Sequence, residues 1–108
     1  MSLDWASVLD RYRGGRTVRP LVGSSTLRVE VDGDALVVTQ RLWRAEVTRS
    51  ELQVALDLLG DRGAQVGAVG FSEELRRHYS GGPQVQPTCS RTPNLSAVVL
   101  VDLGHLRV

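Results

Sequence analysis

Alternating apolar and polar residues on both sides of a short glycine turn are the strongest constraint on how this chain folds. Every second residue is apolar in residues 27–32, and residues 35–39 return after an Asp-Gly-Asp turn centred on Gly33. A period of two is typical of a strand buried on one face, and glycine supplies the positive φ of a tight turn. The pattern predicts an antiparallel hairpin. Residues 42–47 continue it as a third strand, and residues 17–22 could add a short edge strand that a proline weakens.

Two amphipathic helices flank this predicted meander. Residues 3–13 have apolar side chains at helical spacing, and Gly14 and Gly15 can end that helix. After the meander, Thr48 and Glu51 have the spacing of a capping box, in which each side chain accepts a hydrogen bond from the other residue's backbone amide. Apolar residues follow at helical spacing, and we expect Gly60 to close this second helix.

The second half of the chain has weaker patterns. Residues 60–70 are rich in glycine and predict a loop, with a brief strand at residues 65–69. Ser72 can cap a short helix that reaches His78 or Tyr79. Residues 80–94 contain glycine, proline and small polar residues, and they predict a long loop.

The last apolar segment, residues 95–103, fits two structures. Its β-branched residues favour a strand, whereas Asn94 as an N-cap and Gly104 after the end favour a helix. The balance tilts toward a helix, with a strand as the alternative. In either case the chain is expected to be a single α+β domain, residues 1–108, in which an antiparallel meander of three to four strands packs against two to three helices besides the N-terminal one.

The order of these patterns resembles a group of small proteins. The features are the N-terminal helix before Gly14 and Gly15, the hairpin at Gly33, the capping box at Thr48, and the Arg-Thr-Pro-Asn-Leu-Ser-Ala segment at residues 91–97. Together they resemble small actinobacterial domains of unassigned role, some of which occur near restriction-type nuclease domains. The resemblance implies a helix for the last segment and an association with nucleic-acid-processing machinery, and it transfers no catalytic residue.

Composition removes several classes of function. All 13 basic residues are arginine, which is typical of GC-rich coding and leaves no lysine for a phosphate-binding loop, a Schiff base or a kinase site. Cys89 is the single cysteine, so an intramolecular disulfide is impossible. Cys89 and the two histidines, His78 and His105, lie in no recognisable catalytic or zinc-binding motif. We therefore predict no catalytic set, no metal and no cofactor.

The location of the protein is also a prediction from sequence. No apolar run approaches the roughly 20 residues that span a bilayer, and the first basic residue is Arg11, unlike a secretory signal. A lone cysteine suits a reducing compartment. We expect a cytoplasmic protein that does not act at a membrane.

One stretch of the chain has an uneven charge distribution. Residues 11–28 contain arginines but no acidic residue. These arginines are Arg11, Arg13, Arg16, Arg19 and Arg28. They are a candidate nucleic-acid-binding group that would contact phosphates. The alternative is a basic face that is simply solvated.

These observations predict a noncatalytic interaction or accessory module, with nucleic-acid-processing machinery as one setting. The alternative is a protein-binding inhibitor or immunity-type protein that pairs with a partner protein or with a second copy of itself. A small thiol-dependent enzyme that uses Cys89 is the least favoured reading.

Overall fold

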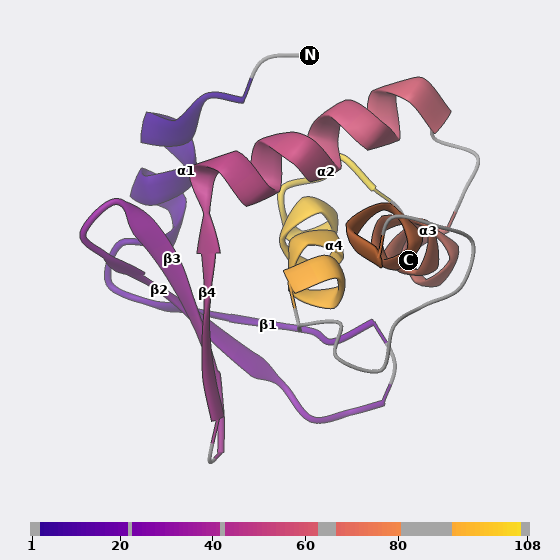
Figure 1. The fold of residues 1–108 in the computed structure, drawn as a ribbon. Helices are drawn as coiled ribbons and strands as arrows, with labels where there is room; N and C mark the ends of the chain where they lie inside the picture. Colours follow the sequence, from indigo (N-terminus) through magenta and orange to yellow (C-terminus); the bar gives the residue numbers. More distant parts are fainter. Residues whose placement is uncertain (1–2, 22, 42, 63–66, 81–91, 107–108) are drawn as a thin grey trace.

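The chain folds as an α+β structure, as the sequence predicts (Figure 1). The computed structural model describes residues 3–21, 23–41, 43–62, 67–80 and 92–106. The elements in chain order are α1 (Trp5–Tyr12), β1 (Arg16–Val18), β2 (Leu27–Asp32), β3 (Ala35–Gln40), β4 (Trp43–Thr48), α2 (Arg49–Arg62), α3 (Ala68–Ser80) and α4 (Thr92–Asp102).

The four strands form one antiparallel sheet in the order β1-β2-β3-β4. Gly33 has φ of 63° in the two-residue turn between β2 and β3, which confirms the predicted hairpin and its need for glycine. The apolar positions Val29 and Val38 face each other across the hairpin and are fully buried. The predicted edge strand is real but shorter than expected, because β1 ends at Val18, two residues before Pro20.

Helix α1 is fixed at its start by side-chain hydrogen bonds. The amide of Ser7 donates to Asp4 Oδ1 at 3.2 Å, so that Asp4 is the N-cap and the helix is shorter than the predicted residues 3–13. The indole of Trp5 donates to Asp34 Oδ1 at 3.0 Å and joins α1 to the turn between β2 and β3. The backbone amide of Leu3 donates to Gln53 Oε1 on α2 at 3.2 Å. Helix α1 therefore connects the sheet with the helical layer.

The predicted capping box at the start of α2 is confirmed. The amide of Glu51 donates to the Thr48 hydroxyl at 3.2 Å, and the amide of Thr48 donates to Glu51 Oε1 at 3.0 Å. The predicted end at Gly60 is wrong, because α2 continues to Arg62. A glycine inside a helix costs about 1 kcal/mol relative to alanine, which the packing of Leu56 and Leu59 into the core offsets.

Helix α3 corrects two expectations. It begins at Ala68, so the brief strand predicted at residues 65–69 is wrong where the structure describes it, and Ser72 lies within the helix rather than at its cap. Ser72 is 3% exposed and faces the core together with Ala68 and Phe71. The short β-like pattern failed because the buried residues Ala68, Phe71 and Leu75 follow helical spacing, whereas Val69 is 49% exposed. The predicted loop, residues 80–94, extends too far toward the C-terminus, because α4 already begins at Thr92.

Helix α4 is the buried centre of the helical layer, where it packs against α2, α3 and β4 (Figure 1). The segment predicted at residues 95–103 is thus helical through Asp102, although Leu103 follows the helix and Asn94 lies inside it rather than at its N-cap. Four consecutive residues from Ala97 to Leu100 are at most 1% exposed. Neighbours on all sides explain why this segment lacks the one-sided apolar pattern of a surface helix.

Candidate functional site

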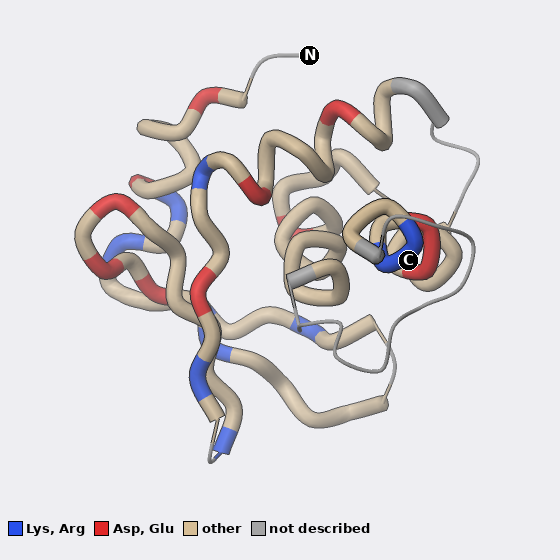
Figure 2. Tube along the Cα trace, viewed as in Figure 1, with Lys and Arg blue, Asp and Glu red and all other residues tan. Residues whose placement is uncertain are grey.

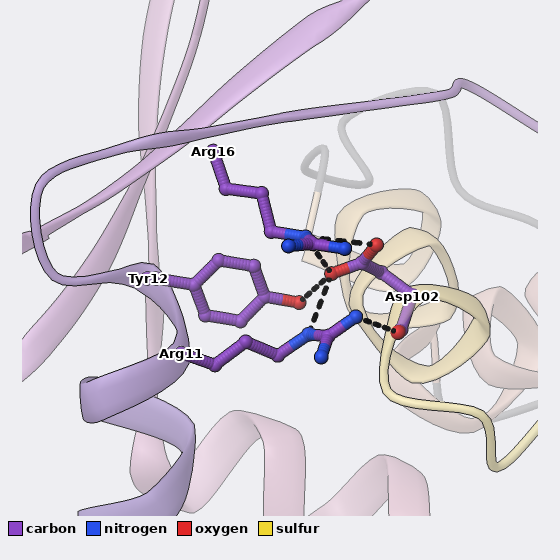
Figure 3. Close-up of polar contacts among 4 residues, drawn as sticks. All are labelled: Arg11, Tyr12, Arg16 and Asp102. Atoms are coloured by element: carbon purple, nitrogen blue, oxygen red, sulfur yellow. Dashed lines mark hydrogen bonds and ion pairs between the residues drawn. The ribbon is translucent and has the colours of Figure 1, made fainter.

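Four polar side chains from opposite ends of the chain meet at Asp102 (Figure 3). We call this set the Asp102 cluster: Arg11, Tyr12, Arg16 and Asp102. The Tyr12 hydroxyl donates to Asp102 Oδ2 at 2.7 Å, and Arg11 Nε donates to the same oxygen at 3.0 Å. Arg16 Nε lies 3.3 Å from that oxygen and 3.5 Å from Oδ1. Arg11 Nη2 also donates to the backbone carbonyl of Asp102 at 2.7 Å.

Local backbone structure places these side chains. Arg11 and Tyr12 are in the last turn of α1, and Asp102 is the final residue of α4. Between Tyr12 and Arg16 the chain reverses through Gly14 and Gly15, both with φ of 87°, a conformation that residues with a Cβ rarely adopt. Arg16 pairs with buried Val29 and faces the helical side of β1, where Asp102 lies.

The cluster stabilises the ionised form of Asp102. Partial burial raises the pKa of the Asp102 carboxyl, but the hydrogen bonds from Arg11 and Tyr12 and the charges of Arg11 and Arg16 outweigh it and hold the pKa below its ordinary value. Burial and the hydrogen bond to Asp102 raise the pKa of Tyr12. Tyr12 is fully buried and the side chain of Asp102 is 17% exposed, so the cluster ties the two ends of the fold together.

Two cavities adjoin the cluster. The first, of about 330 Å³, lies between α4 and the segment that runs from β1 to Leu21, and Asp102 is part of its wall. The second, of about 360 Å³, lies beside the start of α1, and Arg11 and His105 are part of its wall. The Asp102 cluster therefore contributes one charged side chain to each of two hollows, Asp102 to the first and Arg11 to the second.

The five arginines of residues 11–28 do not share one environment. Arg11 and Arg16 belong to the Asp102 cluster. Arg13 forms an ion pair with Asp10, and Arg28 forms one with Glu30 and also donates to the Gly14 carbonyl at 3.3 Å. Arg19 lines the first cavity and forms no ion pair within the described part of the chain. The carboxylates that pair with these arginines come from outside residues 11–28, so that acidic and basic positions lie near one another in the fold (Figure 2).

One face of the sheet is charged, and no helix of the described part of the chain covers it. The side chains of β2 and β4 that point away from the helices are exposed, and we call this surface the open face: Arg28, Glu30, Asp32, Arg44 and Glu46. Arg44 Nη2 reaches across β3 to Asp32 Oδ2 at 3.0 Å, and Arg28 pairs with Glu30. Val37 lies between Glu30 and Glu46 and is only 4% exposed although it is outside the main core.

Sequence reasoning missed Asp102 and Tyr12 as partners. The available signal was an acidic residue at the end of an otherwise apolar segment, which requires charged or hydrogen-bonding partners if the segment is buried. His78 is exposed on α3, with its ring 5.7 Å from that of Tyr79. Cys89 lies outside the described residues. Among those that are described, no three His, Cys, Asp or Glu side chains are grouped so as to hold a metal ion.

Comparison with known proteins adds no assignment. Within the described ranges, no helix has both the length and the apolar character needed to cross a membrane. No protein-family model, curated protein or solved structure matches this chain.

Proposed function

We propose that this protein is a noncatalytic interaction module that binds a partner protein through the open face of its sheet. The observation that carries the proposal is the exposed pattern of both charge signs on β2 and β4, the two strands that flank β3, with Arg28 and Arg44 on the same face as Glu30, Asp32 and Glu46. Electrostatic complementarity of this kind selects a partner and fixes the register of binding.

The arrangement of the arginines favours a protein partner over nucleic acid. A nucleic-acid surface needs arginines that can neutralise phosphates and release counterions. Here Arg11 and Arg16 share Asp102, and Arg13 and Arg28 each pair with a neighbouring carboxylate. The Asp102 cluster joins the two ends of the fold around a carboxylate that is only 17% exposed, which suits a structural role. The ion pairs of the open face are instead about half exposed and accessible to a partner.

The test is site-specific photo-cross-linking in the native cell. A photoreactive amino acid replaces Glu46 on the open face, and the matched control carries it at Ala6, which is exposed on α1. We expect a discrete cross-linked protein from position 46 that is absent from position 6. Arg44→Glu should abolish the product because it reverses a charge of the open face, whereas Arg49→Glu, the same charge change at the start of α2, should preserve it.

The remaining outcomes identify or reject the partner class. A product of twice the chain's mass, together with a dimer in light scattering, identifies a second copy as the partner. Absence of any cross-link from position 46 overturns the proposal. A duplex-DNA affinity that falls about a thousandfold or more between about 50 and 200 mM salt would then assign the function to nucleic acid.

A further inference from the structure

The cavity beside Asp102 combines an apolar wall with a charged rim. Its apolar lining comes from both sides, from the segment after β1 and from α4: Val18, Pro20, Leu21, Val98 and Val101. Thr17, Arg19 and Asp102 supply the polar groups. A volume of about 330 Å³ is near the lower end of the range for small-ligand sites, which are mostly apolar with a few polar groups that orient the ligand.

The charged rim favours an anion. Asp102 is the only carboxylate among the described lining residues, and its charge is opposed by Arg11 and Arg16, whose Nε atoms lie 3.0 and 3.3 Å from Oδ2. Arg19 adds a further positive charge and forms no ion pair with any described residue. Arg11 and Arg16 are outside this lining but offset the charge of Asp102, so that the positive charge of Arg19 is not cancelled by it. A guanidinium binds a carboxylate through two parallel hydrogen bonds.

We propose that this cavity binds a carboxylate attached to a short branched aliphatic group, with the aliphatic part against Val98 and Val101 and the carboxylate on Arg19. This chemistry occurs in small free aliphatic acids and in the C-terminal residue of a peptide that ends in leucine. The site goes beyond the proposed function and is independent of it, because the cavity lies on the helical side of β1 and the open face lies on the other side of the sheet.

The experiment is an NMR titration of the full, isotopically labelled chain, in which the backbone amide chemical shifts report binding. The first probe is 4-methylpentanoate, and its neutral control is 4-methylpentanamide, which has the same shape without the charge. We expect saturable shifts for Thr17, Val18, Arg19 and Val101 with the acid, and a dissociation constant on the order of 1 mM. The amide should bind about tenfold more weakly because it cannot form the charge-assisted pair.

Variants of Arg19 test whether this residue binds the carboxylate of the ligand. Arg19→Gln should weaken binding of the acid about tenfold and leave binding of the amide unchanged. Arg41→Gln is the matched control, since Arg41 is an exposed arginine at the distant turn after β3. Arg19→Lys should restore part of the affinity, because lysine keeps the charge but loses the two parallel hydrogen bonds.

A second pair of probes distinguishes the sources of the ligand. Acetyl-Gly-Leu carries a free C-terminal carboxylate, and its C-terminal amide does not. Tighter binding of the peptide than of 4-methylpentanoate assigns the site to a peptide C-terminus, and the reverse order assigns it to a small acid. Equal binding of acid and amide in both pairs, shifts that do not saturate, or shifts that map to other surfaces would overturn the proposal. None of these results depends on the cross-linking at Glu46.

Discussion

Replacing Asp102 with asparagine should destabilise the fold by about 1.5 kcal/mol at pH 7. Asparagine keeps an oxygen that can accept from Tyr12 but loses the charge that Arg11 and Arg16 contact. The side chains of Arg11 and Arg16 are 36% and 45% exposed, so each ion pair is worth about 0.2–1 kcal/mol. Asp102 itself is only 17% exposed, which places both ion pairs in the upper part of that range. The hydrogen bond from Tyr12 is also weaker to a neutral asparagine than to a carboxylate, which adds to the loss.

Urea denaturation of the wild-type and variant proteins measures this difference, and Tm should fall by about 6 °C. The pKa of Asp102 is lower in the folded state than in the unfolded chain, so the stabilisation is complete above the ordinary aspartate pKa of about 3.9. It disappears as the pH falls through the folded-state pKa, and the two proteins should therefore converge in acid.

A matched control separates the cluster from surface charge in general. Asp10→Asn removes an exposed ion pair with Arg13 and should cost less than about 0.5 kcal/mol. Tyr12→Phe should cost about 1 kcal/mol, and its effect should be smaller when Asp102 is already asparagine, since the two side chains share a hydrogen bond. A loss below about 0.3 kcal/mol for Asp102→Asn, or a loss that is the same at pH 3 as at pH 7, would refute this reasoning.

Three further substitutions test local features of the fold. Thr48→Ala should cost about 1 kcal/mol in urea denaturation, because it removes the hydroxyl that accepts from the Glu51 amide. Ser96→Ala should stabilise the protein by about 1 kcal/mol in the same assay, because the fully buried hydroxyl has no hydrogen-bond partner among the described residues; a loss of stability would contradict this. Gly15→Ala should cost about 1–2 kcal/mol, chiefly because φ is positive there, and the flexible Arg28 side chain must also move away from the added Cβ; an unchanged Tm would contradict this.

The sequence determined those parts of the fold that depend on residues close together in the chain. The hairpin at Gly33 follows from alternation and from one positive φ, and the start of α2 follows from the spacing of Thr48 and Glu51. These patterns are readable because hairpin turns and helix caps are formed by contacts over a few residues.

Tertiary structure decided the rest. Residues 95–102 are helical because α4 is enclosed on several sides. Burial on all faces removes the periodicity that distinguishes a helix from a strand. The partners of Arg11, Tyr12 and Arg16 could not be read from the chain, since Asp102 is 86 to 91 positions away from them. The sequence shows that residues 11–28 are positively charged. Only the packing of α1 and β1 against α4 determines which carboxylate neutralises that charge.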